Sequence, residues 1–172
     1  MEPPLFRVVL HEPEIPNNTG NIGRTCIATG CSLELIKPLG FDTSVKALRR
    51  AGLDYWPRLG VREHDSWADF VRTEGGDDAL PPRIWMLTTK TSRPVWDAPI
   101  NRGDVLLFGK ETAGLPADIL ERYADRAITL PMLPTERSLN VATAVCAVVY
   151  EGIRQLAAAG SVRIAQDGRI EC

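Results

Sequence analysis

A series of short apolar runs separated by helix-like segments is the feature that most constrains how this chain can fold. The spacing predicts strands at residues 5–10, 32–36, 83–88, 104–108 and 127–130, with a weaker one at 59–61. Helices are predicted over residues 19–28, 44–51, 66–72, 116–123 and 138–159. Strands that alternate with helices indicate an α/β fold, with a parallel sheet covered by helices on both faces. We expect one domain over residues 1–160 and a polar C-terminal tail over 161–172.

Two of the predicted helices carry informative patterns. In the first, Ile22, Cys26 and Thr29 share one face, and Gly30 follows as a terminator. Arg24 lies away from that face, so we expect it to point at whatever occupies the preceding loop. The last helix is apolar almost all round in its first half, which predicts burial on most sides, by its own domain or by a second subunit.

The composition limits the kinds of partner. The formal charge is −2 and the pI is near 5.7, so a nucleic-acid ligand would have to meet local clusters of cations. No continuous apolar run reaches the length of a membrane helix and the N-terminus lacks a signal-peptide pattern, so we expect a cytoplasmic protein without membrane contact. The four cysteines form no C-x-x-C pair and there are only two histidines, which argues against a metal site.

Three polar loops follow predicted strands, where parallel α/β proteins bind ligands. The first spans residues 11–24 and contains Asn17, Asn18 and Asn21, whose carboxamides suit a sugar hydroxyl. Its glycines and the start of a helix would let a phosphate approach closely. The alternative interpretation is a capped turn with a surface arginine.

The other two loops are also open to two interpretations. Residues 109–116 (GKETAGLP) do not match a phosphate-binding Walker A loop, because Glu111 follows Lys110 where Ser or Thr is needed. A carboxylate between glycines would suit a neutral or cationic ligand, and the alternative is a tight strand-to-helix turn. In residues 131–140, Ser138 and Asn140 open the predicted long helix and would either bind a ligand or cap the helix.

A cationic stripe is predicted on the second helix, where Lys46, Arg49 and Arg50 share one face. A solvated helix face is the usual explanation for such a run. In an acidic chain it is also the strongest candidate for contact with RNA phosphates.

Five segments taken in order resemble one family: PEIPNNTGNIGR, LRRAGLDYW, LTTK, FGKETAGLP and PMLPTERSLN. They are similar to the SPOUT superfamily of RNA methyltransferases, and within it to the small tRNA ribose 2′-O-methyltransferases of the TrmL/YibK branch. The resemblance runs from about residue 5 to residue 156. It implies an α/β-knot fold with a C-terminal trefoil knot, S-adenosylmethionine as cofactor, a homodimer joined through the last helix, and tRNA as partner. The implied reaction is methylation of the ribose 2′-OH of cytidine or uridine at wobble position 34.

The resemblance also implies site residues. Asn18, Arg24, Glu111, Ser138 and Asn140 match the catalytic pattern. Residues matching the cofactor site are Leu87, Thr88, Gly109, Glu111, Gly114, Leu130, Met132 and Ser138. Because a guanidinium stays charged, we interpret Arg24 as a partner of the phosphate and of the developing alkoxide rather than as the base. Lys110 and His11 depart from the residues that are common at those places in the family.

Three alternatives remain open from the sequence. The substrate could be another tRNA ribose or ribosomal RNA, or the chain could be a non-catalytic RNA-binding module of the same fold. A small-molecule α/β enzyme with a nucleotide cofactor is a more distant alternative.

Overall fold

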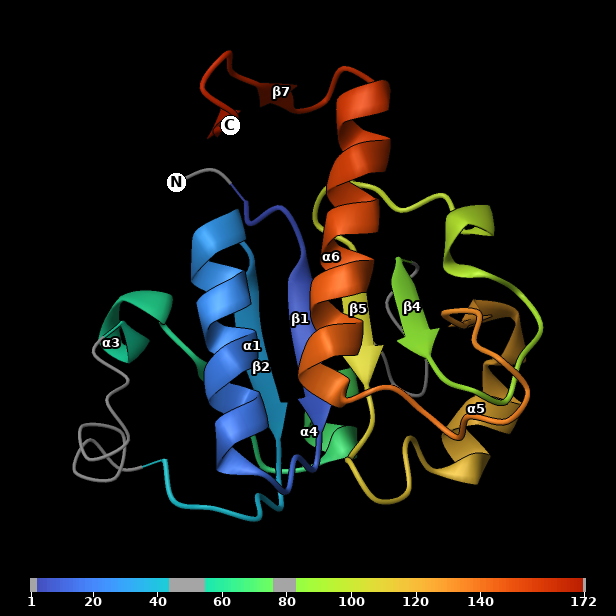
Figure 1. The fold of residues 1–172 in the computed structure, drawn as a ribbon. Coiled ribbons are helices and arrows are strands. Elements are labelled where there is room, and N and C mark those ends of the chain that lie inside the picture. The colour runs from blue at the N-terminus through green and yellow to red at the C-terminus, as the bar shows by residue number, and fades with distance from the viewer. Residues whose placement is uncertain (1–2, 44–54, 76–82, 172) are drawn as a thin grey trace.

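A six-stranded parallel sheet forms the centre of the computed structural model, which describes residues 3–43, 55–75 and 83–171. The strands are β1 (Arg7–His11), β2 (Ser32–Ile36), β3 (Arg62–His64), β4 (Ile84–Leu87), β5 (Val105–Phe108) and β6 (Ala127–Ile128). Their order across the sheet is β3-β2-β1-β5-β4-β6. All six strands therefore end at the same edge, the lower one in Figure 1.

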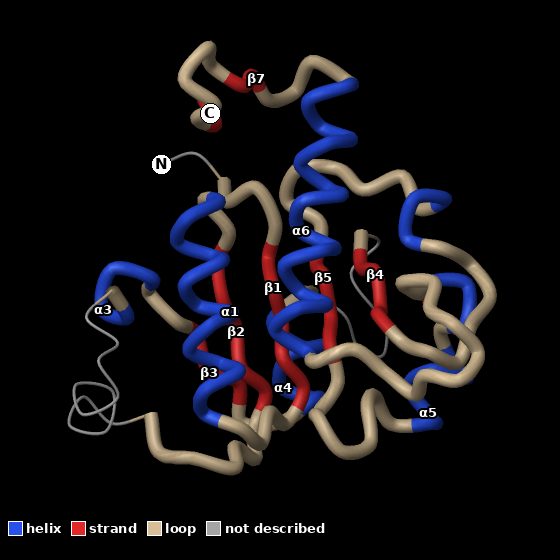
Figure 2. Tube along the Cα trace, in the orientation of Figure 1, coloured by secondary structure: helices blue, strands red, loops and turns tan. Residues whose placement is uncertain are grey.

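Helices cover both faces of the sheet. The long helices α1 (Pro16–Thr29) and α6 (Val141–Ala158) lie side by side on one face, and α4 (Trp67–Thr73) lies behind the other (Figures 1 and 2). The short helix α3 (Trp56–Leu59) lies beside α1, and α5 (Ala117–Arg122) shares a hydrophobic cluster with Met86 of β4. Two 3-10 turns, η1 (Val95–Asp97) and η2 (Ala124–Arg126), complete the described helical segments.

The sheet separates two hydrophobic layers, and β1 shows why. Val8 and Leu10 pack with α1 and α6, whereas Val9 packs on the opposite face with Phe70 of α4. Successive side chains of a strand point to opposite faces, so a strand that is apolar at every position must be covered on both sides. The predicted α/β sandwich is confirmed.

The predicted element boundaries are mostly confirmed, with three corrections. Helix α1 begins at Pro16 rather than at residue 19, because proline is well suited to the first helical turn. Strand β3 covers Arg62–His64 rather than 59–61, since Leu59 ends α3 and Gly60 follows with a φ of 60°. Helix α6 begins at Val141 rather than at 138. The predicted helix 44–51 lies outside the described residues.

Helix α6 is only partly covered in a single copy of the chain. Its buried side includes Val145, Val148 and Ile153, whereas Ala147 and Tyr150 are exposed. By length and composition this helix could also cross a membrane, contrary to the expectation that no segment of the chain would qualify. Its apolar contacts with the sheet and α1 are those of the core helix of a folded domain.

The C-terminal tail forms the small antiparallel hairpin of β7 (Arg163–Ile164) and β8 (Ile170–Glu171), which the polar sequence of this segment did not predict. It lies beyond the end of α6, away from the edge where the parallel strands end (Figure 2).

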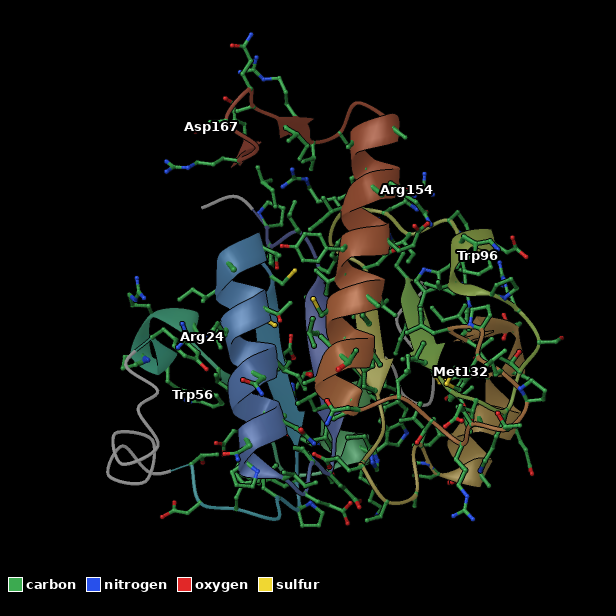
Figure 3. All side chains as sticks on the ribbon, in the orientation of Figure 1. Arg24, Trp56, Trp96, Met132, Arg154 and Asp167 are labelled. Atoms are coloured by element: carbon green, nitrogen blue, oxygen red, sulfur yellow. The ribbon has the colours of Figure 1, made fainter. Side chains whose placement is uncertain are left out.

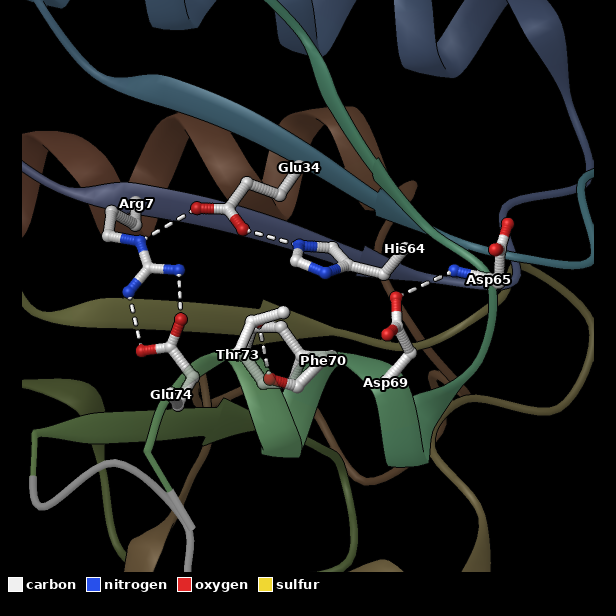
Figure 4. Close-up of polar contacts among 8 residues, drawn as sticks. All are labelled: Arg7, Glu34, His64, Asp65, Asp69, Phe70, Thr73 and Glu74. Atoms are coloured by element: carbon white, nitrogen blue, oxygen red, sulfur yellow. Dashed lines mark hydrogen bonds and ion pairs between the residues drawn. The ribbon is translucent and has the colours of Figure 1, made fainter.

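A chain of charged groups ties α4 to the sheet (Figure 4). Glu34 accepts one hydrogen bond from Arg7 Nε at 2.7 Å and pairs with His64 Nε2 at 2.6 Å, while Arg7 also binds both carboxylate oxygens of Glu74. Burial acts to raise the pKa of the Glu34 carboxyl, but the bonds from Arg7 and His64 outweigh burial and hold that pKa below its usual value. The buried Glu34 and His64 are therefore satisfied together with the half-buried Arg7 and Glu74, and the chain of contacts stabilises the fold.

Candidate functional site

A cavity of about 540 Å³ opens at the edge where the parallel strands end. Three segments supply most of its walls: residues 87–90 after β4, 108–115 at the end of β5, and 129–144 from β6 into α6. Ile15 and Asn18 add the start of α1. Its size falls in the range of small-molecule and cofactor sites, roughly 300–1,000 Å³.

Glu111 fastens the loop after β5 to the loop after β1. Its Oε2 accepts the backbone N–H of Glu14 at 2.8 Å, and its Oε1 accepts the N–H of Ile15 at 3.2 Å and Nδ2 of Asn18 at 3.1 Å. The carboxylate that one interpretation of the sequence assigned to a ligand therefore holds the opening turn of α1. Because charge-assisted bonds are strong, this contact fixes Asn18, which is only 8% exposed.

Asn140 joins the same network from the other side. Its Nδ2 donates to Oδ1 of Asn18 at 3.0 Å, and its own Oδ1 caps α6 by accepting the N–H groups of Ala142 and Thr143. The capping interpretation of Asn140 is confirmed. The residue also lines the cavity, so a ligand contact stays a prediction. Each carboxamide still has an N–H that these bonds do not use.

Gly109 makes the tight turn of the second wall possible. A Cβ at this position would lie 2.1 Å from the carbonyl carbon of Gly114 and 2.2 Å from the nitrogen of Leu115. Only glycine allows the two strands of this loop to approach so closely.

Two further contacts connect the loop after β5 to the loop between β1 and α1. Lys110 Nζ donates to Glu12 Oε2 at 2.8 Å, and the N–H and hydroxyl of Thr112 donate to the carboxylate of Glu14. Glu12 itself has a φ of 50°, an uncommon backbone conformation for a residue other than glycine. The departure from the family pattern at Lys110 therefore has a local ionic partner.

The structure gathers most of the residues singled out from the sequence around one cavity. Asn18, Glu111, Ser138 and Asn140 line it. So do the predicted cofactor residues Leu87, Thr88, Gly109, Gly114, Leu130 and Met132.

Arg24 is the exception. It is exposed on the side of α1 that faces α3, with its guanidinium 4.8 Å from the centre of the Tyr55 ring. Met132 lies on the other side of α6 (Figure 3). Arg24 does not line the cavity of its own chain, contrary to the expectation that it points into the adjacent loop. The predicted phosphate contacts Lys46, Arg49 and Arg50 lie outside the described residues.

Sequence reasoning missed several residues of the cavity wall. Phe108 and Val141 add apolar surface, and Lys90 and Arg137 add positive charge. The sequence did contain a signal for both cations, because Lys90 is the last residue of the LTTK segment and Arg137 lies within TERSLN. Each follows a predicted strand, and the loops after parallel strands converge at one edge.

Comparison with known proteins agrees with this geometry. Residues 5–150 match the model of the SpoU rRNA Methylase family. A tRNA (cytidine(34)-2′-O)-methyltransferase from Saccharophagus degradans is 48% identical over 158 residues, which is 91% of this chain and 99% of that protein.

Two solved structures share the fold. One, on the 2-OH methylation of C/U34 on tRNA, has a TM-score of 0.80 and 42% identity, and the match covers 91% of this chain and 99% of the other. The SpoU methyltransferase AviRb from Streptomyces viridochromogenes, solved in complex with the cofactor AdoMet, has a TM-score of 0.72 and 25% identity over 90% of this chain and 59% of its own. From the matched family model and these similarities, the chain belongs to the SpoU methylase family.

Proposed function

We propose that this chain transfers the methyl group of S-adenosylmethionine to the ribose 2′-OH of the wobble nucleotide, position 34, of tRNA. The observation that carries the proposal is the Glu111–Asn18–Asn140 network, which places two carboxamides at the wall of a cofactor-sized cavity. Cytidine is the expected base, since that is the substrate named for the similar enzyme from Saccharophagus degradans. Uridine is a second substrate to test, as the similar structure concerns C/U34.

The cavity suits S-adenosylmethionine. Leu87, Phe108, Leu130 and Val141 supply apolar wall for an adenine ring, while backbone groups of the glycine turn at 109–114 supply polar contacts. When bound, the cofactor brings an already activated methyl group, so the protein has mainly to align the two reacting atoms. The predicted cofactor residues Thr88, Gly109, Gly114, Met132 and Ser138 line the same space.

Asn18 and Asn140 are suited to hold the ribose. Each has an N–H that remains after the bonds described above, and a carboxamide binds a hydroxyl without adding charge. Glu111 and the α6 cap keep both side chains in place, so Glu111 acts as a positioning residue. Ser138, on the same segment as Asn140, adds a hydroxyl to the cavity wall.

A homodimer would explain the position of Arg24. Apolar surface is exposed on α6 at Ala147 and Tyr150 and just before the helix at Leu139, with Leu139 44% and Tyr150 54% exposed. Covering this face with a second copy would bury it, and would let Arg24 of one copy act in the cavity of the other. There the guanidinium, which stays charged, would bind the substrate phosphate and stabilise the developing alkoxide.

The remaining expectations belong to the same proposal. Lys46, Arg49 and Arg50 contact tRNA phosphates, so exchanging all three for glutamate would weaken tRNA binding and its salt dependence. The C-terminal trefoil knot that the resemblance implies is part of the same proposal. A tRNA-modifying enzyme of this kind would work in the cytoplasm.

Methyl transfer to a defined nucleotide tests the proposal. The purified protein is incubated with labelled S-adenosylmethionine and tRNA lacking wobble 2′-O-methylation, and the labelled nucleoside is then mapped. Label in 2′-O-methylcytidine or 2′-O-methyluridine at position 34 is the expected result. Label at another tRNA ribose, or only in ribosomal RNA, would overturn the substrate and keep the reaction. No transfer to any RNA would favour a non-catalytic binding module.

A further inference from the structure

The cavity wall contains three cations, and they differ in their ionic partners. Lys110 is paired with Glu12 at 2.8 Å. Lys90 and Arg137 form no ion pair with any other residue of the described ranges. The one acidic side chain of the cavity wall, Glu111, is occupied by the backbone of the β1–α1 loop and by Asn18. Positive charge at this cavity is therefore left without a counter-charge from the described protein.

Both unpaired cations are exposed, so they lie at the mouth of the cavity. Lys90 follows β4, and Arg137 lies on the segment that leads to Asn140 and α6. Asn140 in turn contacts Asn18, where we place the ribose. An anion bound by Arg137 would thus lie beside the nucleotide that reacts.

We propose that Lys90 and Arg137 bind the RNA phosphates that flank the target ribose. The inference rests on the proposed function. It adds the positively charged groups that attract an RNA strand to the cavity although the chain as a whole is acidic. A net charge of −2 repels RNA at long range, so the attraction must come from local cations. Arg137 can hold a phosphate through two parallel N–H groups, whereas Lys90 acts as a point charge. The carboxylate of S-adenosylmethionine is the other anion available, and the experiment has to separate the two sources.

The test combines variants of the protein with RNA that lacks one charge. Lys90→Gln, Arg137→Gln and the double variant are compared with Arg169→Gln, which removes an exposed arginine from the C-terminal hairpin. Affinity for a tRNA anticodon stem-loop is measured at several salt concentrations. The same stem-loop is also prepared with a neutral methylphosphonate on the 5′ or the 3′ side of nucleotide 34. Affinity for S-adenosylhomocysteine is measured in parallel by calorimetry.

The double variant is expected to bind the stem-loop about ten- to a hundred-fold more weakly. The slope of log affinity against log salt should fall by about 0.7 for each phosphate that the variant no longer neutralises. A methylphosphonate should weaken binding to the wild-type protein and have little further effect on the double variant. Affinity for S-adenosylhomocysteine should stay unchanged, and Arg169→Gln should behave as wild type in every arm.

Three results would overturn the assignment. If S-adenosylhomocysteine affinity falls while stem-loop affinity is unchanged, the pair binds the cofactor carboxylate. If neither affinity changes, the cations do not bind these phosphates. The same conclusion follows if neither methylphosphonate weakens stem-loop binding to the wild-type protein. Should the wild-type enzyme methylate a different ribose, the proposed function fails, and the same comparison is made on that RNA.

Discussion

Asn18 and Asn140 are 122 positions apart in the chain, yet Nδ2 of Asn140 donates to Oδ1 of Asn18 at 3.0 Å. This bond joins the first turn of α1 to the cap of α6. Through Asn18 Nδ2 it continues to Glu111 on the loop after β5. The three loops that follow β1, β5 and β6 are thus connected by side chains at the cavity.

Substituting Asn18 with aspartate should damage catalysis more than substituting it with alanine. Asn18→Asp keeps the shape but removes the donor and sets a second carboxylate against Glu111, whose Oε1 is 3.1 Å from the amide nitrogen. We expect turnover to fall about tenfold in Asn18→Ala, the cost of about one hydrogen bond, and about a hundred-fold in Asn18→Asp. Steady-state methylation with both substrates saturating measures this. Equal activity in the two variants would show that the contact with Glu111 does not position Asn18.

Gly109→Ala should disrupt the cofactor site while leaving a folded protein. The added Cβ would lie 2.1 Å from the carbonyl carbon of Gly114, so the turn must open. We expect a loss of about 1–3 kcal/mol in the free energy of unfolding, as for other overpacked sites, and at least about a tenfold loss of S-adenosylhomocysteine affinity. Urea unfolding and calorimetry give the two values.

Gly60→Ala is the matched control for that variant. Gly60 also requires glycine, but through its φ of 60° rather than through crowding, because a Cβ there meets nothing within 4 Å. It should cost about 1–2 kcal/mol of backbone strain and leave cofactor affinity unchanged. Unchanged cofactor affinity in a folded Gly109→Ala protein would remove the turn from the cofactor site.

His11→Phe should make the protein less sensitive to acid. Burial lowers the pKa of the His11 imidazole, and its Nδ1 finds no hydrogen-bond partner among the described residues. The unfolded chain therefore binds more protons than the folded one, and stability falls as the pH drops through about 6.5, the pKa of an unperturbed histidine. In His11→Phe the difference in unfolding free energy between about pH 7.5 and about pH 5.5 should shrink.

The same variant should gain about 1 kcal/mol at about pH 7.5, because an unpaired buried polar atom is removed. His11→Asn separates the two effects, since asparagine does not titrate but stays polar. It should flatten the pH dependence without the gain in stability. A pH profile that is the same in all three proteins would show that His11 does not titrate on unfolding.

Ala147→Glu should dissociate the proposed homodimer. Ala147 lies on the exposed side of α6, and in a two-fold interface each substitution occurs twice. We expect the dimer to dissociate at least about tenfold more readily, and methylation to fall with it. Sedimentation over a range of concentrations provides the measurement. Ala117→Glu, also exposed but on α5, should change neither property. An Ala147→Glu protein that sediments as wild type would place the interface elsewhere.

The sequence by itself determined the strands, most of the helices and the loops that carry the site. Runs such as that of β1 are apolar on both faces, and this pattern requires helices on both sides of a parallel sheet. Because all parallel strands end at one edge, the loops containing Asn18, Glu111 and Asn140 had to converge there.

Tertiary structure alone decided what those side chains do. Glu111 accepts hydrogen bonds from backbone N–H groups 96 and 97 positions away, and no local sequence pattern predicts such a contact. The position of Arg24 depends on Tyr55, which directly precedes α3 and whose ring lies next to the Arg24 guanidinium. Periodicity records only which face of an element is apolar, whereas a site depends on which distant segments fold against it.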